Sequence, residues 1–226
     1  MTTKIQGEEA LRQEIVRVGR LVWERGYVAA TDGNLSTRLG DGRILVTASG
    51  LSKGFLGVDD LLVVDLDGRV TEAPRVEGQR PSSELLLHLE VYQQRPDVLA
   101  VVHAHPPIAT AFGIAGESLD RCVLPEVTVT LGGIPTMTYA TPGTQAVPGS
   151  IHDAIRDHDA LLLAHHGSLT VGRTLWEAYL RLEKVEHAAQ ILMAACQLGG
   201  VRELPSEEAS RLRQKRQAWL LSQGRD

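Results

Sequence analysis

Apolar residues near the start of the chain recur at helical spacing. Leu11, Ile15, Val18 and Val22 are separated by four, three and four positions, which places their side chains on one face of a helix over about residues 8–25. Capping residues and apolar spacing predict further helices. These lie over about residues 82–92, 106–114, 150–157 and 174–196, and a charged helix suited to packing across a subunit covers about 206–223.

Short apolar runs bounded by turn residues lie between these helices. Asp41-Gly42 precedes one run, and Asp67-Gly68 separates another run from its return at residues 69–70. Both dipeptides are typical of hairpin turns. The pair Gly132-Gly133 separates two further runs. Strands are therefore predicted at residues 44–47, 61–66, 98–103, 127–130, 136–139 and 160–164.

The order of these elements indicates an α/β fold. Strands cluster in the middle of the chain, which favours a mostly antiparallel central sheet flanked by helices over a doubly wound parallel sheet. We therefore predict a three-layer α/β/α arrangement. The chain has 226 residues, the length of one domain, which we place over residues 1–226 with the helix at about 206–223 as its C-terminal end.

The composition is ordinary for a globular protein. Apolar residues make up 43% and charged residues 23% of the chain, and the formal net charge is −5. No long basic run is present, so nothing indicates binding to nucleic acid or to an anionic membrane. Every apolar run is shorter than a membrane span. Cys122 and Cys196 belong to no CxxC motif, and no signal peptide is evident, so we expect a cytoplasmic protein.

Two pairs of histidines close apolar runs. His103 and His105 follow a run of valines, and in a strand two such residues point to the same face. A second run, at residues 160–164, leads to His165 and His166. Three converging imidazoles with one position open for water or substrate form a typical catalytic metal site.

Strand alternation predicts that only one residue of the second histidine pair joins this site, since neighbours in a strand point to opposite faces. We favour His166, because Gly167 beside it permits a close approach of the backbone. His165 is then expected to lie next to the site or in the core. The other histidines, at positions 88, 152, 158 and 187, have no partner spacing and are interpreted as structural or exposed.

Other polar residues are candidates for a substrate site. Glu84 begins a helix, where a carboxylate near a metal could act as general acid/base or as a fourth ligand. The alternative is an acid favoured there by the helix dipole. Segments 31–36 and 47–54 are rich in glycine and hydroxyl residues, and Lys53 adds positive charge, so they could bind an anion. The alternative is two ordinary turns. Residues 139–144 are interpreted as a loop, which could lie at the mouth of the site.

Six short motifs occur together in one order. They are GNLS at 33–36, TASG at 47–50, PSSE at 81–84, HAH at 103–105, YATPGT at 139–144 and HHG at 165–167. In these motifs the chain resembles the class II aldolase/adducin family, over about residues 8–200. The resemblance implies a nine-stranded, mostly antiparallel sheet between helices, and a C4 homotetramer with active sites at subunit interfaces.

The resemblance also implies one site from these residues. It places Zn2+, with Mn2+, Co2+ or Fe2+ as alternatives, on His103, His105 and His166. It makes Glu84 the catalytic acid/base. It implies that a substrate phosphate is held by Asn34, Ser49, Gly50, Ser82 and Ser83, and Lys53 lies close to the second of these segments.

The activity implied is that of a zinc-dependent aldolase, a lyase that cleaves a small phosphorylated ketose through a metal-bound enediolate. Similar aldolases use a tyrosine shortly after the HxH motif and another in the C-terminal tail. Here residues 121–126 and the residues after Gly200 contain none. A metal-dependent decarboxylase or dehydratase acting on an oxo acid or sugar phosphate is therefore the alternative. Epimerases of the family carry aspartate where Glu84 stands, and adducin lacks the zinc histidines, which disfavours both.

Overall fold

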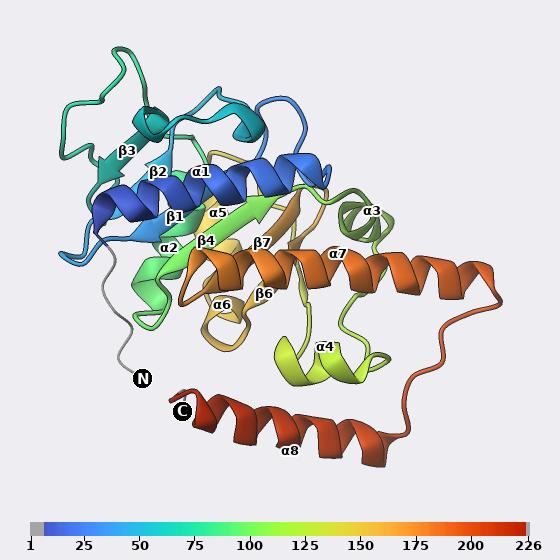
Figure 1. Cartoon of the computed structure of the whole chain (residues 1–226). Coiled ribbons are helices and arrows are strands. Elements are labelled where there is room, and N and C mark those ends of the chain that lie inside the picture. The colour runs from blue at the N-terminus through green and yellow to red at the C-terminus, as the bar shows by residue number, and fades with distance from the viewer. Residues whose placement is uncertain (1–6, 225–226) are drawn as a thin grey trace.

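A seven-stranded sheet forms the centre of the computed structural model, which describes residues 7–224 (Figure 1). Its strands are β1 (Asn34–Arg38), β2 (Ile44–Thr47), β3 (Leu61–Val64), β4 (Ala100–Ala104), β5 (Thr136–Met137), β6 (Ala160–Leu163) and β7 (Gly167–Gly172). Their order is β3-β2-β1-β4-β7-β6-β5. Every neighbouring pair is antiparallel except β5 and β6. The ends of the predicted 1–226 domain, residues 1–6 and 225–226, lie outside the described residues.

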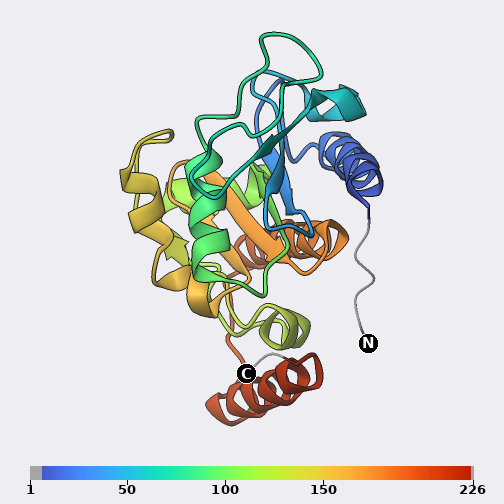
Figure 2. The ribbon, with the colours of Figure 1, turned by 90° about the vertical axis from the view of Figure 1, so that its left-hand side faces the viewer.

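Helices cover both faces of this sheet. The helices α1 (Glu8–Glu24) and α7 (Leu175–Gln197) lie on one face. The helices α2 (Leu85–Gln94), α5 (Ala146–Ile151) and α6 (Ala154–Asp157) lie on the other, as the side view in Figure 2 shows. The remaining elements are α3 (Pro107–Ala115), α4 (Pro125–Thr130), α8 (Ser206–Ser222) and two short 3-10 turns, η1 (Lys53–Phe55) and η2 (Val58–Asp60). The predicted three-layer, mostly antiparallel fold is confirmed.

The alternation of side chains along β2 shows why a wholly apolar strand suits this position. Ile44 and Val46 belong to the cluster packed under α2, whereas Leu45 belongs to the cluster packed under α1 and α7. All three are buried. Since successive residues of a strand point to opposite faces, a central strand covered on both sides buries every side chain.

The predicted start of α7 has the expected capping contact, and a serine makes a local contact just before α2. Thr174 Oγ1 accepts a hydrogen bond from the backbone N–H of Glu177 over 3.0 Å, and the Glu177 carboxylate accepts one from the N–H of Arg173 over 2.7 Å. Ser82 Oγ accepts one from the N–H of Glu84 over 3.2 Å, just before α2 begins. These contacts satisfy backbone donors that have no partner inside the helix.

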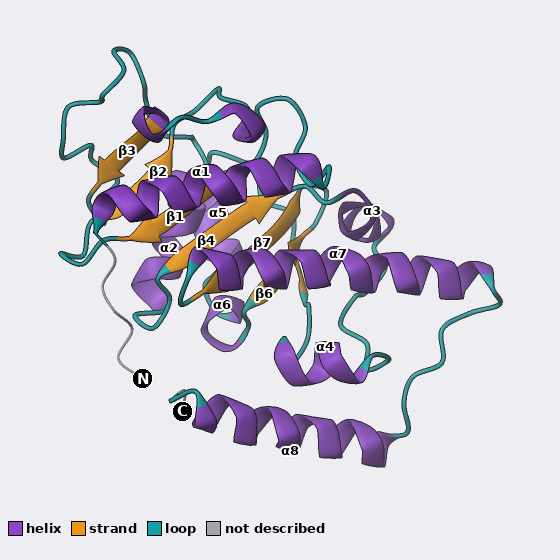
Figure 3. Ribbon diagram, viewed as in Figure 1, coloured by secondary structure: helices purple, strands orange, loops and turns teal. Residues whose placement is uncertain are grey.

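The prediction of a strand at residues 127–130 is wrong, because these residues belong to α4 (Figure 3). The alternating Val and Thr residues are typical of a strand. However, Pro125 occupies the first turn of the helix, where its fixed φ suits a helix start. The hydroxyl of Thr130 donates to the carbonyl of Glu126 over 2.6 Å, so a local helical contact replaces a strand pairing.

The strands differ from expectation in three further ways. β1 and β7 were not predicted, because Asn34, Ser36 and Ser168 are polar residues that are buried here. The strand predicted at 61–66 ends at Val64, and its return forms only the single bridge between Val64 and Val70. The described residues therefore form a sheet of seven strands rather than the nine that the resemblance implied.

The predicted C-terminal helix docks on its own chain, as α8 lying against α4 (Figure 1). Arg216 of α8 donates to the carbonyls of Thr130 and Val129 over 2.8 and 3.3 Å. Its guanidinium occupies the space beside Gly132, where a Cβ would lie 2.5 Å from Arg216 Nε. The absence of a side chain at Gly132 thus makes room for the residue that anchors α8.

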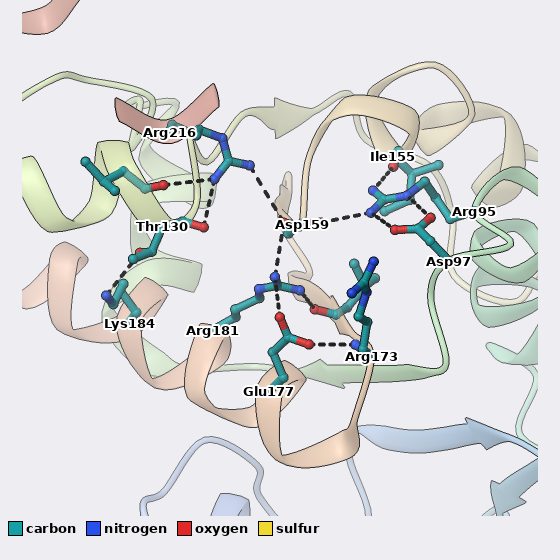
Figure 4. A network of polar contacts seen from close by, with 12 residues as sticks. Arg95, Asp97, Thr130, Ile155, Asp159, Arg173, Glu177, Arg181, Lys184 and Arg216 are labelled. Carbon is teal, nitrogen blue, oxygen red and sulfur yellow. Dashed lines mark hydrogen bonds and ion pairs between the residues drawn. The ribbon is translucent and has the colours of Figure 1, made fainter. Parts of the chain in front are cut away.

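A buried carboxylate joins this anchor to the rest of the fold (Figure 4). Asp159 is fully buried and lies 3.1 Å from Arg95 Nη2, 3.2 Å from Arg181 Nη2 and 3.7 Å from Arg216 Nη2. These arginines come from the end of α2, from α7 and from α8. Asp159 therefore couples three elements that are far apart in the sequence.

We expect Asp159→Asn to lower the free energy of unfolding by about 3 kcal/mol, since the neutral side chain no longer balances the positive charges of the buried arginines around it. Urea unfolding followed by circular dichroism measures this. Asp153→Asn is the matched control, because the Asp153 side chain is 96% exposed and lies 3.9 Å from Arg156. The control should unfold like the parent protein. Equal effects of the two substitutions would contradict the coupling role of Asp159.

None of the helices in residues 7–224 is both long and apolar enough to cross a membrane.

Candidate metal centre

Three histidines converge where β4 meets the β6–β7 hairpin. His103 lies in β4 opposite Leu169 of β7, and His105 follows directly after this strand. His166 lies in the turn that connects β6 to β7. One ligand atom from each of these histidines lies within 4.8 Å of the other two. The structure thus brings together the three residues that the sequence selected as metal ligands.

The donor set fits a divalent metal ion. His103 Nδ1 lies 2.9 Å from the carbonyl oxygen of Ser168, so it carries the proton and leaves Nε2 free to coordinate. Nε2 of His103 and Nε2 of His105 are 3.1 Å apart. In a tetrahedral zinc site with bonds of about 2.0–2.1 Å, two ligand nitrogens lie about 3.3 Å apart. These two imidazoles are therefore at nearly the spacing that coordination requires.

The electrostatics of the site favour neutral imidazoles. Burial lowers the pKa of His103 to about 3, although the nearby Glu84 acts in the opposite direction. Burial also lowers the pKa of His105. Since a metal ion binds the unprotonated ring nitrogen, histidines that stay neutral at physiological pH need no proton removed before they coordinate.

Glu84 is the carboxylate of this site. Glu84 Oε1 lies 2.8 Å from His166 Nε2, and Oε2 lies 3.5 Å from His103 Nε2. Burial alone would raise the pKa of Glu84. The contacts with His166, His103 and the Asn34 amide outweigh burial and hold that pKa well below its usual range. Glu84 is consequently ionised at neutral pH and lies beside the candidate ligands.

His166 joins the cluster for a reason other than strand alternation. His165 and His166 lie in a turn rather than in a strand, and His165 has a φ of +56°. This backbone conformation directs the two imidazoles apart. His165 instead approaches Tyr139, with ring centroids 6.1 Å apart. The choice of His166 matches the geometry, but the reasoning from a strand at this position was wrong.

Gly167 has the close backbone approach that the sequence suggested. A Cβ on Gly167 would lie 2.5 Å from the carbonyl oxygen of Ala104 and 2.6 Å from Cδ2 of His105. Both distances are shorter than a carbon atom tolerates. A side chain here would push the imidazole of His105 away from its position or separate β7 from β4.

We therefore expect Gly167→Ala to weaken binding of a divalent metal by about tenfold or more, because ligand orientation contributes on that scale. Competition with a chelating dye measures the affinity. Gly149→Ala is the matched control, since a Cβ at Gly149 meets nothing within 4 Å. Equal metal affinities of the two variants would show that the approach at Gly167 does not constrain the site.

The segments predicted to bind an anion lie side by side. Ala48 forms a bridge with Pro81, and the N–H of Ser49 donates to the carbonyl of Arg80 over 2.9 Å. These contacts bring Gly50, Ser49, Ser82 and Ser83 from two separate segments to one place. The 139–144 loop approaches one of them, because a Cβ on Gly143 would lie 3.2 Å from Cβ of Ser83. An anion role for these residues stays a prediction.

Two other members of the predicted anion pocket have protein partners. Asn34 Nδ2 donates to Glu84 Oε2 over 2.8 Å. Lys53 is buried, and its Nζ donates to the carbonyls of Thr31 and Leu51 over 2.9 and 2.5 Å. Burial lowers the pKa of Lys53 to about 8. The ammonium group of Lys53 therefore holds two loops together, and an anion role for Lys53 stays a prediction.

Two residues of the site were missed in the sequence. Asp32 Oδ2 lies 3.7 Å from His105 Nδ1, so this carboxylate is placed to orient the imidazole. His88, interpreted as structural or exposed, is buried and contacts Asn34 Oδ1 through Nε2. Asp32 could have been identified from its position in the sequence, since it directly precedes the GNLS motif. For His88 the signal was the four-residue spacing from Glu84, which places both on one helix face.

Comparison with known proteins identifies the family. Residues 13–193 match the model of the Class II Aldolase and Adducin N-terminal domain. The chain belongs to this family. As a class II aldolase family member, it has the fold of a group of metal-dependent enzymes that act on small molecules, and its three histidines could bind a metal ion.

Relatives of this family member have different activities. It is 33% identical to 3-oxo-tetronate 4-phosphate decarboxylase from Escherichia coli strain K12, over 82% of this chain and 87% of that protein. It is 34% identical to L-fuculose phosphate aldolase from Methanococcus maripaludis, over 79% and 93%. The crystal structure of YgbL from Escherichia coli matches with a TM-score of 0.83 and 32% identity, over 91% of this chain and 99% of YgbL.

Proposed function

We propose that this protein is a metal-dependent lyase that breaks the carbon–carbon bond between the carbons α and β to the carbonyl group of a small phosphorylated oxo compound. The observation that carries this proposal is the contact between a partly buried carboxylate and a three-imidazole cluster, with Glu84 Oε1 2.8 Å from His166 Nε2. A proton-transferring group beside a Lewis-acid site is the arrangement that carbanion chemistry requires.

His103, His105 and His166 would hold the metal ion, for which we propose zinc, with Mn2+, Co2+ or Fe2+ as alternatives. When bound, such an ion acts as a Lewis acid and stabilises the negative charge that develops on substrate oxygens as the bond breaks. The chain supplies orientation. Ser168 fixes His103 through its carbonyl, and Asp32 lies 3.7 Å from His105.

Glu84 moves the proton at the reacting carbon. Its carboxylate is ionised at neutral pH, because hydrogen bonds and the histidines lower its pKa. It can therefore accept a proton as a base and return it as an acid. The side chain is 14% exposed. Substrate bound over Glu84 would exclude the water that remains there, which strengthens the electrostatic interactions inside the site.

The phosphate group of the substrate is proposed to lie against Ser49, Gly50, Ser82 and Ser83, with the amide of Asn34 at the edge nearest Glu84. Hydroxyl groups and backbone N–H groups of converging loops suit an anion. The 3-oxo-tetronate 4-phosphate decarboxylase and L-fuculose phosphate aldolase relatives are both named for phosphorylated compounds, which supports a phosphorylated substrate here.

Aldol cleavage of a phosphorylated ketose is the reaction that we propose first, as in the L-fuculose phosphate aldolase relative. Decarboxylation of a phosphorylated oxo acid is the second candidate. The observation that favours it is the absence of tyrosine from residues 121–126 and from the residues after Gly200. Aldol cleavage needs a group to take the hydroxyl proton of the departing aldehyde, whereas carbon dioxide leaves without one. Dehydration of a sugar phosphate is the remaining alternative, and a separate assay for a dehydrated product would detect it.

A product assay distinguishes these reactions. The metal-loaded protein is incubated with L-fuculose phosphate and with 3-oxo-tetronate 4-phosphate, and aldehyde and carbon dioxide are measured separately. Aldehyde from the first substrate would establish the aldolase, and carbon dioxide from the second would establish the decarboxylase. Turnover of neither substrate, in a protein that carries stoichiometric metal, would count against a lyase of these substrates.

We further propose a cytoplasmic homo-oligomer, with a C4 tetramer as the expected form. A surface groove of about 700 Å3 between α4 and α7, lined by Tyr27, Leu124 and Leu180, supports an interface there. The groove adjoins the metal site, since the carbonyl of Tyr27 accepts a hydrogen bond from the N–H of His105 over 2.8 Å. Light scattering after gel filtration tests the assembly.

A further inference from the structure

A buried chain of hydrogen bonds leads from the carboxylate of Glu84 into the core. Asn34 Nδ2 donates to Glu84 Oε2 over 2.8 Å, and Asn34 Oδ1 lies 2.5 Å from His88 Nε2. His88 Nδ1 lies 2.6 Å from Ser36 Oγ, which is 2.8 Å from the hydroxyl of Tyr92. His88 and Tyr92 are 2% exposed and Ser36 is fully buried. Bulk water therefore does not compete for the contacts that His88, Ser36 and Tyr92 make.

The chain is assembled from one strand and one helix with matching repeats. β1 contributes Asn34 and Ser36, which are two residues apart and point to the same face of the sheet. Glu84, His88 and Tyr92 follow each other at intervals of four residues, at the start of α2 and along it. Two residues along a strand span about 6.8 Å, and four residues along a helix span about 6 Å. Because these two spacings are similar, the side chains of β1 and those of Glu84, His88 and Tyr92 can alternate along the chain of hydrogen bonds.

Hydrogen-bond chemistry determines the direction of every link. An ionised carboxylate only accepts, so the Asn34 amide presents N–H to Glu84 and its carbonyl oxygen to His88. That oxygen requires a proton on His88 Nε2. A neutral imidazole has one N–H, so His88 Nδ1 accepts from the hydroxyl of Ser36, and Ser36 in turn accepts from Tyr92. All donors consequently point toward Glu84.

We propose that His88 is a positioning residue, which holds the amide of Asn34 in the one orientation that presents N–H to the proton-transferring carboxylate of Glu84. This inference rests on the proposed function of Glu84. The ring nitrogens of His88 contact Ser36 and Asn34 rather than the candidate metal ligands, and the side chain is 2% exposed. It acts through Asn34, since the opposite orientation of the amide would place two acceptor oxygens against each other at Glu84 and two donors against each other at His88.

The surroundings of His88 suit this task. Burial lowers the pKa of His88 to about 4, which keeps the ring neutral with one donor and one acceptor. A cavity of about 10 Å3, lined in part by Asn34, Ser82 and His88, lies beside the chain. It has room for about one water molecule. Asn34 therefore has little space in which to swing away from Glu84.

Substitution of His88 tests the proposal in the metal-loaded protein. We expect His88→Leu to lower kcat by about 10- to 100-fold, because a misplaced catalytic group loses rate on this scale. KM should change by less than about threefold, since substrate binding does not use His88. His88→Gln should recover most of kcat, because the amide N–H2 of glutamine can donate to Asn34 from near the position of Nε2.

His152→Leu is the matched control. His152 Nδ1 lies 2.6 Å from the buried carboxylate of Glu90, which is also on α2 but outside the chain that leads to Glu84. This variant loses a comparable contact between a histidine and α2, so its thermal stability should fall while kcat is retained. If His88→Leu and His152→Leu had the same kcat, or if His88→Gln were as slow as His88→Leu, His88 would be only structural and the proposal would be overturned.

A second measurement is independent of any substrate. In the protein with 15N-labelled histidine, the ring of His88, assigned by its loss in His88→Gln, should show a protonated Nε2 and an unprotonated Nδ1. A proton on Nδ1 would overturn the proposed direction of the chain. If the parent protein turned over none of the tested substrates, the proposed function would be overturned. The spectrum of His88 would still decide the orientation of the Asn34 amide.

Discussion

His103→Ala is expected to leave the purified protein with almost no bound divalent metal and no measurable turnover. His103 is fully buried, and the carbonyl of Ser168 fixes its ring so that Nε2 faces the other two imidazoles. Loss of a partner that merely orients a ligand costs about 10- to 100-fold in metal affinity, and loss of a ligand should cost more. Elemental analysis after gel filtration, at equal protein concentration, measures the metal content.

Two other variants make this result specific. His187→Ala removes an exposed imidazole from α7 and should keep the metal content of the parent protein. His165→Ala should lose much less metal than His166→Ala, because His165 faces Tyr139 rather than the cluster. Full metal content in His103→Ala or His166→Ala would show that the ion binds elsewhere. A circular dichroism spectrum equal to that of the metal-free parent protein would exclude unfolding as the cause.

The layers of the fold could be predicted from the sequence, because they depend on local patterns. Apolar spacing placed α1, and the capping contact of Thr174 with Glu177 marked the start of α7. Short apolar runs gave the strands of the middle region. The patterns did not predict β1 and β7, because the buried positions of these strands include Asn34, Ser36 and Ser168. A polar residue in a strand is normally predicted to face solvent, unless the residue that forms a hydrogen bond with it is known.

The partners of these polar residues are distant in sequence, which is why the site was predicted only in part. Asn34 is 50 positions from Glu84, and Ser36 is 52 positions from His88. Their contacts exist because β1 lies against α2 in three dimensions. The histidine pairs were easier to identify, because the HxH spacing is local and the ligand chemistry is specific. The prediction for α4 was wrong because a proline at a helix start outweighed the β-branched residues after it.

The role of Glu84 shows the same limit. From its position in the sequence alone, Glu84 was better explained as an acid favoured by the dipole of α2, and only the family resemblance made it catalytic. The structure instead gives its two oxygens contacts with His166, His103 and Asn34. None of these contacts involves the first turn of the helix. The carboxylate therefore belongs to the candidate metal centre, and its contribution is to be measured in catalysis rather than in the stability of the helix.

Glu84→Gln is expected to lower kcat by about 10²- to 10⁴-fold while the metal stays bound, which is the range for removal of a general acid or base. Glutamine keeps the shape of the side chain and can still accept a hydrogen bond from Asn34, but it cannot take up a proton. The three imidazoles are unchanged. Steady-state kinetics with the substrate identified by the product assay, together with elemental analysis of the same sample, measures both quantities.

Glu90→Gln is the matched control, since Glu90 is a buried glutamate of α2, the helix that Glu84 precedes, and it contacts His152 rather than the histidine cluster. Loss of this carboxylate should change thermal stability with kcat retained. Nearly normal turnover of the Glu84→Gln protein would show that Glu84 serves only as an acid at the start of a helix. A slow Glu84→Gln protein that had also lost its metal would make Glu84 primarily a ligand. Only slow turnover with full metal content, alongside an active Glu90→Gln protein, assigns proton transfer to Glu84, because no other change in the site then accounts for the lost rate.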